Sequence, residues 1–215
     1  MNSIKQRFGS VNLEKAYYVG VCVLTVAVVF LYSSTGMVYG ATVTVSATVG
    51  SSITCATDNT STSFGTLTSG AITTSTLNAS TTMSCNVGTG CTLSINDAGN
   101  TVNGGLSTSS PAYLIPSPNG AFAASATLVA GTEGYGVMAT TTAVGSGGTL
   151  GIATRYLQTF TGNTVGGLTT STLTLASSTA SISAREVVVR HKAAISGITQ
   201  AASYTDTITY SCAGN

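Results

Sequence analysis

The segment ATVTVSATV, residues 41–49, alternates apolar and hydroxyl side chains over its whole length. Successive side chains of a β-strand point to opposite faces, so a period of two predicts a strand with one apolar face. That face holds Val43, Val45, Ala47 and Val49. The same period returns at 77–85, 91–96 and 204–212. We therefore expect an all-β domain of antiparallel strands.

The chain around this segment carries little charge. Of its 215 residues only 6% are charged, the formal net charge is +1, and there is one His and no Trp; an average globular domain has about 25% charged residues. So few Lys and Arg argue against nucleic-acid binding, because affinity for phosphates depends on neutralising their charge. So few titratable groups also argue against acid–base catalysis. A composition rich in Thr, Val, Ala and Gly is typical of a secreted β-protein, for which we predict no cofactor and no metal.

Upstream, residues 1–40 are organised like an export segment. Three basic residues accompany an apolar run at 16–32, and a short stretch rich in small residues follows. This order is typical of a secretory signal peptide, and we expect cleavage between Gly40 and Ala41. A retained transmembrane helix is one alternative, because the run is at the short end for a membrane span.

A second alternative is processing as a prepilin. The residues around Gly9 and Glu14 resemble the cleavage site of type IV pilins, in which a Gly precedes the cut and Glu is the fifth mature residue. In all three cases the basic residues keep the N-terminus in the cytoplasm. The rest of the chain is then secreted or displayed on the cell surface, and only the N-terminal segment meets the membrane.

The exported part has an even number of cysteines. Of five in the chain, Cys22 lies in the apolar run, where we interpret it as apolar filler, and the others are Cys55, Cys85, Cys91 and Cys212. Outside the cytoplasm an even number predicts disulfides. Zinc is the rival interpretation, but the only short spacing is Cys85-x5-Cys91 and zinc sites usually include His. Four cysteines allow three pairings, and the sequence alone does not choose among them.

The middle of the chain predicts short strands separated by glycine-rich turns. Candidate strands are 126–129, 135–140, 154–160, 172–176 and 187–195, and the proline-containing segment 109–120 is expected to be a loop. Many short strands with frequent turns favour a two-sheet sandwich. The predicted organisation is an export segment at 1–40, an alternating strand at 41–52 and one sandwich domain at 53–215.

The order of several motifs suggests a family. The alternating segment runs into Cys55, Phe64-Gly65 and Leu67 follow, Cys85 comes next, and the chain closes with ASYTDTITY at 202–210. This order resembles the spore coat protein U domain, shared with Csu-type chaperone–usher pilins.

The resemblance implies an immunoglobulin-like β-sandwich that lacks one strand, which a neighbour's N-terminal segment supplies by β-augmentation. The donated side chains are then Val43, Val45, Ala47 and Val49. We favour the pairing Cys55–Cys85, which is the family's disulfide, with Cys91–Cys212 as an additional bridge. A periplasmic chaperone is an implied partner. A self-complete sandwich, with 41–49 folded back onto its own domain, remains open.

These features predict a structural protein of the cell surface, a subunit of a pilus-like or fimbria-like fibre or of a coat that self-associates by strand donation. The alternative is a monomeric adhesin or carbohydrate-binding sandwich, in which exposed Tyr113, Tyr135 and Tyr156 stack on a glycan.

We predict that the protein is not an enzyme. His191 has no second His beside it, and Asp206 is interpreted as an acceptor at a strand end or turn. Arg185, Arg190 and Lys192 are expected on a solvated face or an edge strand, where charge discourages uncontrolled pairing.

Overall fold

The computed structural model describes residues 17–18, 20–22, 24–25, 42–118 and 125–215, and it divides into two units, 1–48 and 49–215. In the first unit, the described residues between 17 and 25 are helical, and 42–48 are exposed and without regular structure. Among the described residues, no helix has the length and hydropathy needed to cross a membrane. The expected cleavage sites after Gly9 and Gly40, and most of the expected apolar helix, lie outside these ranges.

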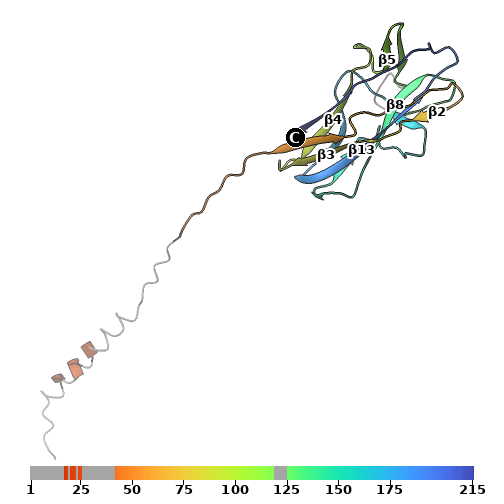
Figure 1. Ribbon diagram of the computed structural model, residues 1–215. Coiled ribbons are helices and arrows are strands. Elements are labelled where there is room, and N and C mark those ends of the chain that lie inside the picture. Colours follow the sequence, from red (N-terminus) through yellow and green to blue (C-terminus); the bar gives the residue numbers. More distant parts are fainter. Residues whose placement is uncertain (1–16, 19, 23, 26–41, 119–124) are drawn as a thin grey trace, which may run out of the picture. The chain divides into compact units, whose positions relative to one another are not determined.

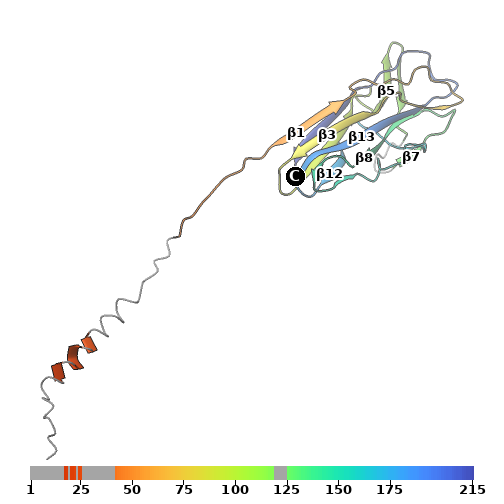
Figure 2. The same ribbon diagram turned by 60° about the horizontal axis from the view of Figure 1, so that its bottom comes forward.

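The second unit is built from antiparallel sheets (Figure 1). The strands of the larger sheet are β1 (Ile53–Asp58), β2 (Ile72–Thr74), β3 (Ala79–Cys85), β7 (Ser125–Thr127), β8 (Gly134–Thr141), β9 (Ser146–Gly147), β11 (Thr164–Gly166) and β13 (Ile182–Ala194). Their order is β1-β3-β13-β8-β11-β7, and β2 and β9 also pair with β13. Figure 2 shows β1, β3, β13, β8 and β7 succeeding one another across this sheet.

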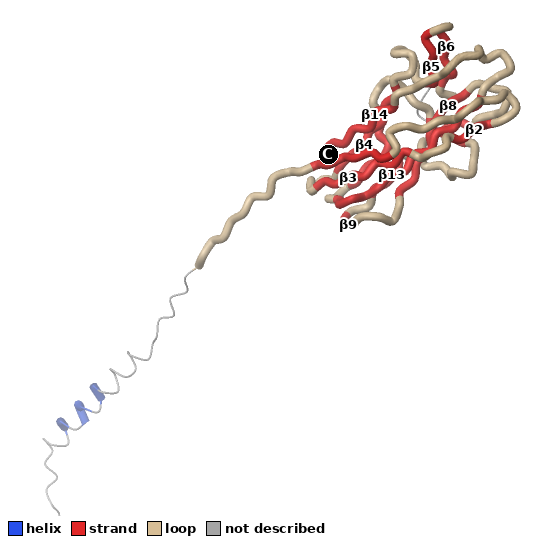
Figure 3. Tube along the Cα trace, in the orientation of Figure 1, coloured by secondary structure: helices blue, strands red, loops and turns tan. Residues whose placement is uncertain are grey.

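A smaller sheet packs on the larger one. Its strands are β4 (Cys91–Asp97), β10 (Leu150–Ile152), β12 (Leu173–Ser178) and β14 (Ile208–Gly214), in the order β10-β12-β4-β14. A separate hairpin is formed by β5 (Gly105–Ser109) and β6 (Ala112–Pro116), which Figure 3 shows at one end of the unit. The predicted all-β architecture of antiparallel strands is thus confirmed.

The period of two correctly identified the buried face of β3 and β4. Along both strands buried and half-buried residues alternate without interruption. Met83 on β3 and Leu93 on β4 are fully buried and belong to one apolar core between the sheets. Thr81 shares the buried face of β3, where its hydroxyl lies 3.0 Å from the hydroxyl of Thr57 on β1.

Two predictions for the middle of the chain are wrong. Residues 154–160, expected as a strand, form turns in which the Tyr156 N–H donates to the Ala153 carbonyl at 2.8 Å. Segment 109–120, expected as a loop, contains β6, which pairs with β5. Proline is tolerated in such a strand because it lies at strand ends and on edges, where no ladder N–H is required, and Pro116 is the last residue of β6.

The expectation of a solvated or edge strand for the basic residues near His191 is also wrong, because β13 lies between β3 and β8. Lys192 is buried, and its Nζ donates to the Gly162 carbonyl and to Asn163 Oδ1. The Arg190 guanidinium lies 4.5 Å from the centre of the Phe160 ring. Loops from distant parts of the chain therefore cover these cations. The local sequence pattern around residues 185–192 does not predict this burial.

Candidate functional site

The strands β1 and β14 are the adjacent edges of the two sheets, and we call the line along which they meet the seam. Within the described residues β1 pairs only with β3, and β14 pairs only with β4. Each strand therefore has one side without a ladder partner. Such an edge is a template for pairing with another strand.

The register shows which backbone groups face the seam. The Ala98 N–H donates to the Thr207 carbonyl at 2.9 Å, and the Asn215 N–H to the Gly90 carbonyl at 3.0 Å. In an antiparallel pair, hydrogen-bonded and non-hydrogen-bonded residue pairs alternate. The odd-numbered residues of β14 therefore bond to β4, and the even-numbered ones direct their N–H and C=O groups toward the seam.

The same reasoning applies to β1. The Asn86 N–H donates to the Ser52 carbonyl at 3.2 Å, so the even-numbered residues bond to β3. Ile53, Cys55 and Thr57 direct their backbone groups toward the seam. Both walls of the seam thus offer N–H and C=O groups for additional hydrogen bonds.

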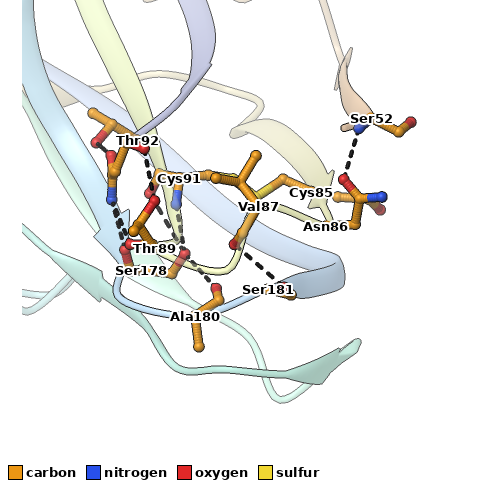
Figure 4. The surroundings of a disulfide bond; sticks show 12 residues. Ser52, Cys85, Asn86, Val87, Thr89, Cys91, Thr92, Ser178, Ala180 and Ser181 are labelled. Carbon is orange, nitrogen blue, oxygen red and sulfur yellow. Dashed lines mark hydrogen bonds between the residues drawn. A yellow bond between two sulfur atoms is a disulfide. The ribbon is translucent and has the colours of Figure 1, made fainter. Parts of the chain in front are cut away.

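Two disulfides join the sheets, and their pairing corrects the one we favoured. Cys55 on β1 bonds to Cys212 on β14, and Cys85 at the end of β3 bonds to Cys91 at the start of β4. Figure 4 shows Cys85 and Cys91 linked beside the turn that carries Val87 and Thr89. The favoured bridge Cys55–Cys85 is absent because Cys55 lies opposite Met83 in the ladder between β1 and β3. All four predicted cysteines do form disulfides.

The two bridges differ in exposure. Cys85 and Cys91 are buried in the core, whereas Cys55 is exposed and Cys212 is half-buried. Cys55 is exposed because β1 is an edge strand that the opposite sheet only partly covers. The Cys55–Cys212 bridge lies on the seam. The Cys85–Cys91 bridge joins β3 and β4, which are the next strands of the two sheets.

The candidate donor segment precedes β1. Residues 42–52 form no regular strand. Val43, Val45 and Val49 are 84%, 88% and 85% exposed, and Ala47 is also exposed. Among the described residues no strand pairs with this segment, so its backbone lacks the partners that the expected strand requires.

The side chain of Asn86, the residue after β3, binds the backbone just before β1. The Asn86 Nδ2 donates to the Gly50 carbonyl at 2.8 Å, and Asn86 Oδ1 accepts from the Ser52 N–H at 2.7 Å. One amide therefore holds the backbone on both sides of Ser51. These two bonds oppose a tight reversal of the chain at this point.

A second group of polar side chains lies inside the sandwich, near the start of β14. The Gly105 N–H donates to Asp97 Oδ2 at 2.9 Å, and the Gly99 N–H donates to Asp206 Oδ1 at 3.2 Å. The other two oxygens, Asp97 Oδ1 and Asp206 Oδ2, have no N–H or O–H donor among the described residues. Burial, and then the charge of Asp206, raise the pKa of Asp97 to about 8. A proton held by this carboxyl pair supplies the missing donor.

Tyr135 lies near this pair and bonds in turn to His191. The Tyr135 hydroxyl lies 2.9 Å from His191 Nδ1, and the two rings are stacked. Burial lowers the pKa of His191 to about 4, so the ring is neutral at physiological pH. Asp97, His191 and Tyr135 are at most 5% exposed, so all three lie in the interior of the sandwich. Sequence reasoning missed Asp97, although it continues the inward parity of Cys91, Leu93 and Ile95.

The tyrosines expected to bind a glycan are not arranged for it. Tyr135 and Tyr156 are 2% and 0% exposed. Tyr113 is half-buried, and its hydroxyl donates to Glu133 Oε1 at 2.8 Å. The described residues contain no group of three or more His, Cys, Asp or Glu placed to hold a metal ion.

The fold and the seam define a class of protein, an antiparallel β-sandwich whose two sheets are joined by two disulfides. Comparison of the chain with protein-family models, with curated proteins and with solved structures finds no match. The function is therefore argued from the seam and from the segment that precedes it.

Proposed function

We propose that the protein is an extracytoplasmic structural subunit of a pilus-like fibre or coat, in which residues 42–49 of one copy add a strand to the sandwich of the next. The observation that carries this proposal is the exposed alternating segment itself. It contains no charged residue and no proline that would oppose strand pairing. Its valines are exposed although β-augmentation could bury them.

Burial and backbone pairing both favour this association. Fully burying one valine side chain contributes about 1.5–3 kcal/mol of favourable free energy. Burying the three exposed valines in a second copy would therefore favour association strongly. The backbone hydrogen bonds of an added strand contribute affinity, and the alternating side chains contribute specificity. The immunoglobulin-like topology, an assembly chaperone and export by a signal peptide belong to the same proposal, supported by the sequence motifs.

Deleting residues 42–49 from the full chain is expected to abolish multimers, because the donor strand is lost while the described sandwich, 53–118 and 125–215, keeps its contacts. Size-exclusion chromatography and native electrophoresis of the secreted product measure the ladder of multimers. Multimers at normal yield from the deleted chain would rule the proposal out.

A matched pair of point variants separates the apolar face from the segment as a whole. Val45→Asp places a charge on the face to be buried, whereas Thr44→Asp places it on the opposite face of the same strand. We expect Val45→Asp to lower the multimer yield at least tenfold and Thr44→Asp to change it little. Equal effects of the two variants would show that strand pairing with one buried face is not the mode of assembly.

A further inference from the structure

The Cys55–Cys212 bridge obstructs the seam at which a donor strand would be added. The Cα atoms of the two cysteines are 6.0 Å apart. Neighbouring strands of a sheet are about 4.8 Å apart, so two strands that flank a third are separated by roughly 9.6 Å. A third strand therefore cannot lie between β1 and β14 at the bridge.

The packing next to the bridge closes the same end of the seam. A side-chain carbon at Gly214 would lie 3.4 Å from Ile53 Cδ1 and 3.1 Å from Val87 Cγ2. The space beside Gly214 at the end of β14 is thus filled by the side chains of Ile53 on β1 and of Val87. Separating the two strands at this end requires the covalent bond to open first.

We propose that the Cys55–Cys212 bridge controls access to the seam, so that only a chain in which this bridge is open accepts residues 42–49 of a second copy. This inference rests on the proposed function and names the regulation of its acceptor site. A second copy is the occupant because Asn86 holds Gly50 and Ser52 and so opposes a reversal that would return the chain's own segment along β1.

The exposure of the bridges makes the step selective. A thiolate of a dithiol reductant attacks the bridge at the sulfur of Cys55, the more exposed residue of the two, forms a mixed disulfide and releases the Cys212 thiolate. The second thiol of the reductant then displaces Cys55 and closes the reductant's own disulfide. In sum, the S–S bond is broken, and two electrons and two protons pass from the dithiol to the protein. The Cys85–Cys91 bridge is buried, so it reacts more slowly with the same reagent.

The test measures binding of a fluorescent peptide with the sequence of residues 42–49 to the full chain. The oxidised protein is compared with protein treated with limiting dithiol, in which alkylation and mass spectrometry show that Cys55 and Cys212 are reduced and Cys85–Cys91 is intact. We expect at least tenfold tighter binding to the reduced protein. A peptide with the valines replaced by threonine is the control for nonspecific adhesion.

Two double variants complete the test. Cys55→Ala/Cys212→Ala is expected to bind the peptide without reductant, and Cys85→Ala/Cys91→Ala is expected to bind it only after reduction. Circular dichroism establishes that each form is folded. Equal binding by oxidised and reduced wild-type protein would overturn this inference and leave the proposed function standing. Folded protein that neither binds the peptide nor forms multimers in any state would overturn the proposed function. A chain that unfolds whenever Cys55–Cys212 opens would overturn the inference, because no seam would then remain.

Discussion

Replacing Cys55 and Cys212 by alanine is expected to lower the free energy of unfolding by about 5 kcal/mol, whereas the same replacement of Cys85 and Cys91 is expected to lower it by about 2 kcal/mol. The difference follows from the sequence separations, 157 and 6 residues. A cross-link restricts the unfolded chain, and the restriction grows with the length of the loop that it closes. Since domains are stable by about 5–15 kcal/mol, the first loss is a large fraction of the total.

Denaturant unfolding of the oxidised wild-type protein and of the two double variants measures both values. Peptide mapping without reductant identifies the bridged fragments and serves as the independent control for the pairing. If the Cys85/Cys91 variant were the less stable of the two, the long-range bridge would not be the main covalent contribution to stability. Fragments joined as Cys55–Cys85 would contradict the structure directly.

The free energy of unfolding is expected to fall by about 2 kcal/mol as the pH rises from about 6.5 to about 8. Burial, with a further contribution from Asp206, raises the pKa of Asp97 from 3.8 to about 8. Between these two values the folded chain binds a proton that the unfolded chain has released. The stabilisation is therefore fully present below the unfolded pKa and is lost as the pH rises through the folded pKa. Burial raises the pKa of Asp206 as well, which acts in the same direction.

His191 has the opposite effect at lower pH. Because burial lowers its pKa from 6.5 to about 4, the unfolded chain binds a proton there that the folded chain does not. Protonation of the unfolded chain at His191 therefore lowers the free energy of unfolding as the pH falls from 6.5 toward 4. Over the same range it offsets the increase in that free energy that comes from Asp97. The net dependence should be weaker between pH 4 and 6.5 than above pH 6.5, where His191 no longer opposes the loss.

Chemical denaturation at a series of pH values checks this profile. Asp97→Asn keeps the shape of the side chain and removes the titrating proton, so its stability should change little between pH 6.5 and 8. Asp58→Asn, at an exposed position of β1, is the matched control and should retain the wild-type profile. A wild-type profile that stays flat over this range would mean that the carboxyl pair does not hold the proton.

Local patterns identified the strands whose two faces meet different surroundings. β3 and β4 alternate in sequence because one face of each packs in the core and the other does not. β14 was identified for the same reason, since Ile208, Tyr210 and Cys212 are half-buried and the residues between them are exposed. The presence of disulfides was also predictable, because the even number of cysteines after residue 40 can be counted without knowing which strands are neighbours.

Other features depend on contacts between residues far apart in the chain. Lys192 is covered by the loop around Gly162, and Asp97 obtains a partner in Asp206 only when the start of β14 lies beside the end of β4. Neither contact leaves a periodic signal, because periodicity reports only the environment of one strand at a time. For that reason the sequence pattern predicted a solvated position for the basic residues of β13.

The sequence by itself determined that the chain is β-rich, which faces of its strands are apolar, and that an uncharged alternating segment precedes the first cysteine. The tertiary structure alone decided that Cys55 bonds to Cys212, that β1 and β14 face each other across a closed seam, and that a carboxyl pair lies buried near Tyr135. The physical reason is that alternation is a property of neighbouring residues. Bridges and buried pairs depend on which distant strands the fold brings together.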